Sequence, residues 1–173
     1  KILIHGPGSG DRQLARQIIK WAEASGADCL DVPTKVLEKI AVKDNPQSLI
    51  GVFEQHFHEA PVPETTTSKG PWIALEAIRD PGNLGTIMRT ADAAGAAGII
   101  LVGTTCDPYQ HEAVRASMGS IFSVPLVRLD ATAFLDLAKR WSGAVIGTHL
   151  VGAVDFRKAT YDQPTLLVMG TEG

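Results

Sequence analysis

The amino-acid sequence predicts an α/β fold: a parallel β-sheet covered by helices over residues 72–173, preceded by a smaller α/β unit over residues 1–54. The first observation is that strand-like and helix-like runs alternate after residue 72, as they do in parallel sheets with helices on both faces. The second is that residues 55–71 contain three prolines, a Thr-Thr-Thr-Ser run and few apolar side chains, which is the composition of a linker. We therefore expect two domains joined by this segment.

Three elements are expected in the first domain. KILIH at residues 1–5 indicates a strand, and residues 12–26 indicate an amphipathic helix that ends at Gly26. QSLIGVFEQ at residues 47–55 indicates a second strand. These elements are sufficient for a small α/β unit.

Eight elements are expected in the second domain, and they alternate in type. Apolar runs predict strands at residues 72–78, 98–103, 123–129, 144–150 and 165–170. Amphipathic patterns predict helices at residues 84–95, 111–119 and 131–141. The order is that of a parallel sheet with crossover helices.

The composition is that of a globular protein, with 45% hydrophobic and 20% charged residues. Because the formal net charge is −3, a polyanion such as RNA would have to be bound by local groups of basic side chains. Cys29 and Cys106 lack the spacing of a disulfide framework or a zinc site. No apolar run approaches the roughly 18 residues of a membrane span, and no signal-peptide pattern opens the sequence. We therefore expect a cytoplasmic protein with no membrane partner.

Two glycine-rich loops compete as binding sites, and the first is HGPGSG at residues 5–10. A strand, a glycine-rich turn and a helix are what a Rossmann-type methyltransferase or nucleotide-binding protein would show, and Asp28 and Asp31 follow at the distance of a ribose-binding acid. Pro7, however, lacks a backbone N–H, and no Lys-Ser/Thr pair follows as in a P-loop. A plain turn between strand and helix is the simpler interpretation.

The second loop is RDPGNLGTIMRTADAAGA at residues 79–96. Asn83 is a candidate cap for the following helix, because its side chain can accept hydrogen bonds from free backbone N–H groups. Arg89 is expected near the helix N-terminus, where the helix dipole disfavours a cation, and such a placement indicates a functional role. A surface salt bridge is the simpler alternative.

Three spaced motifs connect the second domain to a known family. Asn83-x-Gly85-x-x-x-Arg89, then Arg115-x-Ser117-x-Gly119, then LLVMGTEG at residues 166–173 resemble, in order and spacing, the SpoU/TrmH branch of the SPOUT RNA methyltransferases. The resemblance implies a SPOUT domain with a trefoil knot that forms a homodimer. It implies transfer of a methyl group from S-adenosylmethionine to a ribose 2′-hydroxyl of ribosomal or transfer RNA.

The resemblance also assigns site residues. The implied catalytic residues are Asn83, Arg89 and Glu172, and the implied RNA-binding residues are Arg89, Arg115 and Ser117. Because guanidinium stays protonated, Arg89 is expected to act on a phosphate and a developing alkoxide rather than as a base. The cofactor is expected at the carboxyl ends of two strands. The residues implied there are Thr148, His149, Leu150, Gly152, Met169, Gly170, Thr171 and Gly173.

Residues 1–54 are similar to part of the L30e-like RNA-binding domain, on the basis of DNPQSLIGVFEQ at residues 44–55. The resemblance implies that this domain lacks its beginning here. It also implies that a further motif of the family lies beyond Gly173, where it would complete the knot, the cofactor pocket and the dimer interface.

Two further interpretations are considered. His56 and His58 lie two residues apart, but no third and fourth ligand is spaced to join them, so no metal site is expected. A non-catalytic RNA-binding module is the remaining alternative; the presence of Asn83, Arg89 and Glu172 together favours the enzyme.

Overall fold

The computed structural model describes residues 1–41, 47–67, 70–149, 151–161 and 164–170. The chain forms two compact units, Lys1–Gln55 and His56–Gly173. Along the described residues, no helix combines the length and the apolar character that crossing a membrane requires.

The first unit is a three-stranded sheet with two α-helices. Strand order is β2-β1-β3; β2 runs parallel to β1, and β3 runs antiparallel to it. The elements are β1 Ile2–His5, η1 Ser9–Asp11, α1 Gln13–Ala24, β2 Asp28–Asp31, α2 Thr34–Ala41 and β3 Leu49–Val52. The strand and helix predicted first are confirmed, and the strand predicted at residues 47–55 is shorter. The sequence analysis missed β2 and α2.

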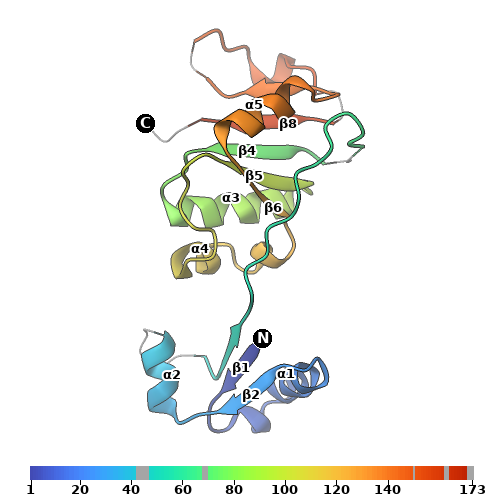
Figure 1. Ribbon diagram of the computed structural model, residues 1–173. Coiled ribbons are helices and arrows are strands. Elements are labelled where there is room, and N and C mark those ends of the chain that lie inside the picture. Colours follow the sequence, from blue (N-terminus) through green and yellow to red (C-terminus); the bar gives the residue numbers. More distant parts are fainter. Residues whose placement is uncertain (42–46, 68–69, 150, 162–163, 171–173) are drawn as a thin grey trace. The chain divides into compact units, whose positions relative to one another are not determined.

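The second unit is a five-stranded sheet in which every strand pair is parallel, so the predicted parallel α/β architecture is confirmed. Strand order is β6-β5-β4-β8-β7 (Figure 1). The strands are β4 Trp72–Glu76, β5 Gly98–Val102, β6 Leu126–Leu129, β7 Val145–Gly147 and β8 Leu166–Met169. The helices are α3 Pro81–Ala93, α4 His111–Ala116, η2 Ser120–Phe122, α5 Ala131–Lys139 and η3 Phe156–Lys158. The predicted helix at residues 111–119 therefore ends early, because Met118 and Gly119 adopt positive φ angles of 51° and 97°.

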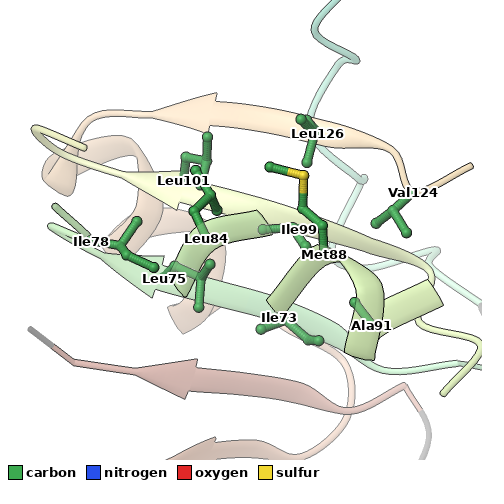
Figure 2. Close-up of a cluster of buried hydrophobic side chains, with 10 residues drawn as sticks. All are labelled: Ile73, Leu75, Ile78, Leu84, Met88, Ala91, Ile99, Leu101, Val124 and Leu126. Carbon is green, nitrogen blue, oxygen red and sulfur yellow. The ribbon is translucent and has the colours of Figure 1, made fainter. Parts of the chain in front are cut away.

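The sheet carries a hydrophobic cluster on each face, and alternate residues of each strand supply the two clusters. On one face, Leu84, Met88 and Ala91 of α3 pack against Ile73 and Leu75 of β4 (Figure 2). On the other, α5 covers the sheet with a cluster that contains Trp72, Ala74, Ile100, Val102, Val127, Phe134, Leu137, Trp141 and Leu166. Strands β4 and β5 are thus buried on both sides, as their continuous apolar runs predict, whereas edge strand β7 is largely exposed.

Helix α4 packs closely against α3, and Gly85 makes this approach possible. A Cβ atom at Gly85 would lie 2.5 Å from the carbonyl oxygen of Ala113 and 2.6 Å from the Cβ of Ala116. Because backbone atoms stand in the way, the two helices cannot keep this distance with a larger residue at position 85.

The segment interpreted from its composition as a linker lies against the second unit. The backbone N–H of His58 donates to the carbonyl of Leu126 at 2.7 Å, beside edge strand β6. The backbone N–H of His56 donates to the hydroxyl of Tyr109 at 3.1 Å, and that hydroxyl donates in turn to the carbonyl of His56. Phe57 packs on the α3-side cluster, with its ring edge-to-face with Tyr109.

The same segment is held a second time, at the end of α5. Arg140 Nη1 donates to Glu64 Oε1 at 2.6 Å, and Arg140 also contacts Asp136 at 2.9 Å. Hydrogen bonds from its own backbone N–H and from Arg140 lower the pKa of Glu64. We call residues 56–66 the strap. Although it contains no helix or strand, the strap belongs to the second unit.

Replacing Gly85 by alanine should destabilise the second unit. The added methyl group meets backbone atoms of α4, so the helices must separate, and we expect a loss of about 1–3 kcal/mol in the free energy of unfolding. Urea denaturation followed by circular dichroism measures it. Gly147→Ala is the matched control, because a Cβ there has no atom within 4 Å; equal stability of the two variants would contradict the packing argument.

Candidate functional site

The candidate site lies where the carboxyl ends of β4 and β8 meet. Leu75 of β4 pairs with Met169 of β8, and Gly147 of β7 pairs with Val168, so these parallel strands end at one edge of the sheet. From β4 the chain passes outward through β5 to β6. It then crosses to β7 at the other edge and returns to β8, which lies between β4 and β7. Ligands of open parallel sheets bind at such a reversal of strand order.

A cavity of about 270 Å³ occupies this position. Its walls come from the end of β4, the first turns of α3 and the end of β8. The lining residues are Leu75, Glu76, Ile78, Asn83, Thr86, Ile87, Met169 and Gly170. Apolar side chains thus form most of the wall, and Asn83 and Thr86 add polar groups, which is the usual composition of a ligand pocket.

Asp80, rather than Asn83, caps helix α3. Asp80 Oδ1 accepts a hydrogen bond of 2.6 Å from the backbone N–H of Asn83, and Pro81 occupies the first helical position. The prediction that Asn83 is the cap is therefore wrong. Because the helix begins at Pro81, Asn83 lies inside its first turn and lines the cavity instead.

Arg89 lies far from the helix N-terminus. It is the ninth residue of the 13-residue helix, so the argument that the helix dipole disfavours it there is wrong. Arg89 follows Asn83 by six positions, which places the two side chains about 120° apart around the helix axis. Arg89 is exposed and is not among the residues that line the cavity. Within one chain, Asn83 and Arg89 therefore project from different sides of α3.

The segment after β7 contains three of the predicted cofactor-binding residues, Thr148, His149 and Gly152. The backbone N–H of Thr148 donates to the carbonyl of Val168 at 2.9 Å, which continues the pairing of β7 with β8. Nδ1 of His149 lies 3.0 Å from the backbone nitrogen of Val151 and 3.2 Å from its carbonyl oxygen. Gly152 has φ 74°, which favours glycine at this turn.

The predicted residues at the end of β8 are only partly described. Met169 and Gly170 line the cavity, and a Cβ at Gly170 would meet no atom within 4 Å, so the space beside this backbone is open. Leu150, Thr171, Glu172 and Gly173 lie outside the residues that the structure describes. The structure thus brings Asn83, Met169 and Gly170 together.

The two remaining RNA-binding predictions fall on and just after α4. Arg115 is exposed. Ser117 is completely buried, and its hydroxyl donates to the carbonyl of Val114 at 2.7 Å. Its burial does not support the RNA contact predicted for Ser117; the side chain instead closes the end of α4, opposite Gly85.

Several cavity residues were not predicted from the sequence, among them Glu76, Thr86 and Ile87. Thr86 and Ile87 follow Asn83 by three and four residues, a spacing that puts all three on one side of a helix and could have identified them. Ala77 has φ 49°, a left-handed conformation that costs a non-glycine residue about 1 kcal/mol or more. This turn takes the chain from β4 toward α3, and no local pattern in the sequence signals it.

Two backbone N–H groups of the HGPGSG loop already donate to carbonyl groups of the first unit. The backbone N–H of Gly6 donates to the carbonyl of Ser48 at 3.0 Å, and that of Ser9 donates to the carbonyl of Gly6 at 3.2 Å. Ser9 is buried, with its hydroxyl bonded to the same two carbonyls. Since Pro7 has no N–H, this turn leaves few donors for a phosphate.

The two histidines of the strap stack edge-to-face at 4.5 Å. Within the described part of the chain, no group of three or more His, Cys, Asp or Glu side chains is arranged to hold a metal ion.

The sequence and fold were compared with known proteins. Residues 71–173 match the model of the SpoU rRNA Methylase family. The chain is 29% identical over 149 residues to the 23S rRNA (guanosine(2553)-2′-O)-methyltransferase RlmP of Bacillus subtilis, covering 86% of this chain and 58% of that protein. It is 42% identical over 106 residues to the 23S rRNA (uridine(2479)-2′-O)-methyltransferase of Streptomyces viridochromogenes, covering 58% of this chain and 37% of that enzyme.

The fold is similar to that of an rRNA methyltransferase from Sinorhizobium meliloti, with a TM-score of 0.87 and 42% identity over 99% of this chain and 64% of that one. The AdoMet-bound structure of an rRNA methyltransferase from the same organism gives a TM-score of 0.85 and 43% identity over 99% of this chain and 63% of that one. The chain therefore spans less than two thirds of the length of these relatives.

Loss of the α3 cap should weaken both the fold and the cavity. Asp80→Ala removes the acceptor for the N–H of Asn83, and we expect a loss of about 1 kcal/mol in the free energy of unfolding, measured by urea denaturation. Asp130→Ala removes the corresponding cap of α5, a 2.8 Å bond from Ala133, and should lose a similar free energy of unfolding. If Asp80→Ala were as stable as the unmodified protein, the assignment of the cap would fail.

Proposed function

The chain belongs to the SpoU rRNA methylase family, and from this membership we propose that the protein transfers a methyl group from S-adenosylmethionine to a ribose 2′-hydroxyl of a structured RNA. The observation that carries the proposal is the cavity at the β4/β8 edge, where Asn83 of the motif Asn83-x-Gly85-x-x-x-Arg89 meets Met169 and Gly170 of the LLVMGTEG motif.

The cavity suits part of this cofactor. Its volume of about 270 Å³ lies at the lower end of the range of about 300–1,000 Å³ for ligand pockets. Leu75, Ile78, Ile87 and Met169 offer apolar contacts, and Gly170 leaves space beside its backbone. S-adenosylmethionine supplies an electrophilic methyl group when bound. Thr148, His149 and Gly152, together with Leu150, Thr171 and Gly173, are proposed to hold the adenosine.

The residues of the chain then have to hold the ribose oxygen in line with the donor and assist the departure of its proton. Asn83 lines the cavity and is proposed to orient the ribose through its side-chain amide. Arg89 is proposed to bind an RNA phosphate and to stabilise the developing alkoxide, since a guanidinium cannot serve as a base at neutral pH. Glu172 is proposed as the partner that fixes Arg89 or accepts a hydrogen bond from the ribose.

A homodimer is part of the proposal. Arg89 is exposed on α3 about 120° away from Asn83, and it does not line the cavity of its own chain. A second copy offers a way to bring this side chain to the reacting ribose. The trefoil knot and the L30e-like assignment of residues 1–54 rest on the family resemblance and are proposed with it.

The substrate is proposed to be ribosomal or transfer RNA in the cytoplasm. Two relatives carry the names of 23S rRNA 2′-O-methyltransferases that act on different nucleosides, a guanosine and a uridine. Arg115, exposed on α4, is proposed as a phosphate contact.

Arg89→Ala should reduce methyl transfer while leaving the fold intact. Removal of one electrostatic contact to a transition state typically costs about 100-fold or more in rate, which is roughly 2.7 kcal/mol. Single-turnover transfer of a radioactive methyl group to unmodified ribosomal RNA measures the rate, and calorimetry with S-adenosylmethionine reports whether the cofactor site survives.

Lys139→Ala on α5 serves as the control for loss of an exposed cation, and its rate should equal that of the unmodified protein. Mixing Arg89→Ala with Asn83→Ala tests the dimer, because activity returns only if the two residues act across subunits. Unchanged turnover of Arg89→Ala would rule out the assigned role.

The two alternative cofactor sites can be separated by substitution. Gly170→Val fills the open space beside the end of β8 and should abolish cofactor binding, whereas Gly8→Ala in the HGPGSG loop should leave cofactor binding within about twofold, since no cofactor is proposed there. Isothermal titration calorimetry measures both affinities. Loss of binding in Gly8→Ala alone would replace the present proposal with the Rossmann-type alternative.

A further inference from the structure

The chain between β7 and β8 exposes an unusual number of apolar side chains. We call residues 151–161 the β7–β8 loop. In it Val151, Val154 and Phe156 are 82%, 72% and 72% exposed, and Tyr161 is 48% exposed. Single exposed apolar residues are common on protein surfaces, but a group of four within one short loop indicates a contact surface.

The loop nevertheless has a defined conformation. Asp155 Oδ1 accepts from the backbone N–H of Arg157 at 3.0 Å, and Arg157 Nη2 donates to Asp155 Oδ2 at 2.7 Å. The hydroxyl of Tyr161 donates to the carbonyl of Phe156 at 2.8 Å. Hydrogen bonds from the Arg157 side chain and backbone lower the pKa of Asp155, and the Asp155 side chain caps η3. The apolar side chains are therefore presented by a fixed turn.

The tip of the loop combines an aromatic ring with positive charge. The guanidinium of Arg157 lies 5.9 Å from the ring centroid of Phe156. Lys158 follows and is exposed. The loop carries two cations and one carboxylate, Asp155, in a protein whose formal net charge is −3. Because Arg157 is paired with Asp155, the loop has a net charge of +1, and the exposed ammonium of Lys158 favours an anionic partner.

The position of the loop also fits a large substrate. It begins at Val151, shortly after Thr148 and His149, which follow the carboxyl end of β7, and β7 is an edge strand of the sheet. Figure 1 shows the loop, in orange, on the side of the sheet opposite α4. A structured RNA whose ribose enters the β4/β8 cavity extends over neighbouring surfaces, and this loop is one of them.

We propose that the β7–β8 loop is an RNA-contact surface in which Phe156 stacks on an unpaired base of the substrate and Lys158 binds a neighbouring phosphate. The inference rests on the proposed function and adds a recognition surface to it. Unpaired bases stack on aromatic side chains whatever their sequence, and a nearby cation binds the backbone. Arg157 backs the ring and, through Asp155, holds its orientation.

The test separates stacking from simple apolar contact. Phe156→Leu keeps an apolar side chain but loses the flat ring, and we expect the Kd for unmodified ribosomal RNA transcribed in vitro to rise about tenfold. Phe156→Trp should bind within about twofold of the unmodified protein. Lys158→Ala should reduce the slope of log K against log salt concentration by about one, while Phe156→Leu leaves that slope unchanged. Fluorescence anisotropy with the full-length protein measures all of these.

Controls make the outcome decisive. Leu135→Ala removes an exposed apolar side chain from α5 and should bind RNA normally; affinity for S-adenosylmethionine should be unchanged in every variant. Equal RNA binding by Phe156→Leu and the unmodified protein overturns the inference, as does equal weakening by Leu and Trp. A change of oligomeric mass in Phe156→Leu, seen by sedimentation, also overturns it and assigns the loop to a subunit contact. If the unmodified protein methylates no RNA ribose, the proposed function fails separately.

Discussion

The pairing of β8 between β4 and β7 is the constraint on which the rest of the second unit depends. About 90 residues separate Leu75 from Met169, yet the two are neighbours in the ladder. Because the strands are parallel, this single register puts the turn after β4, the start of α3 and the end of β8 at one edge. The cavity exists only there, since it needs a wall from each of these three segments.

Different sides of helix α3 make three different contacts. Leu84 and Met88 enter the core, Gly85 lies against α4, and Asn83 faces the cavity. A helix turns about 100° per residue, so each of these directions is set by sequence position once the first turn is fixed. The cap at Asp80 fixes that turn. Arg89 then points away from the cavity of its own chain, and this geometry is the physical reason for including a second copy in the proposed site.

The structural unit is larger than the segment that matches the family model. The match begins at residue 71, whereas the strap begins at His56 and is attached at both ends. Its contact with Leu126 lies beside β6, whose outer side would otherwise be an unpaired strand edge. An unpaired edge is open to pairing with other chains, so the strap protects the sheet as well as connecting the units.

The sequence by itself determined the parallel α/β architecture and the family, because alternating apolar runs and spaced motifs are properties of contiguous residues. It also placed Asn83 and Gly170 in one site. The structure corrected the cap of α3 from Asn83 to Asp80, a local feature that Asp80 followed by Pro81 at the first helical position signals in the sequence. Strand β2, DCLD, was missed because its exposed, polar sequence carries no strand pattern, and pairing with β1 alone makes it a strand. The strap has the composition of a linker, and its attachment depends on partners such as Tyr109 and Arg140, which lie more than 50 residues away. Contacts between residues so far apart produce no periodic pattern in the sequence, so they cannot be predicted from it.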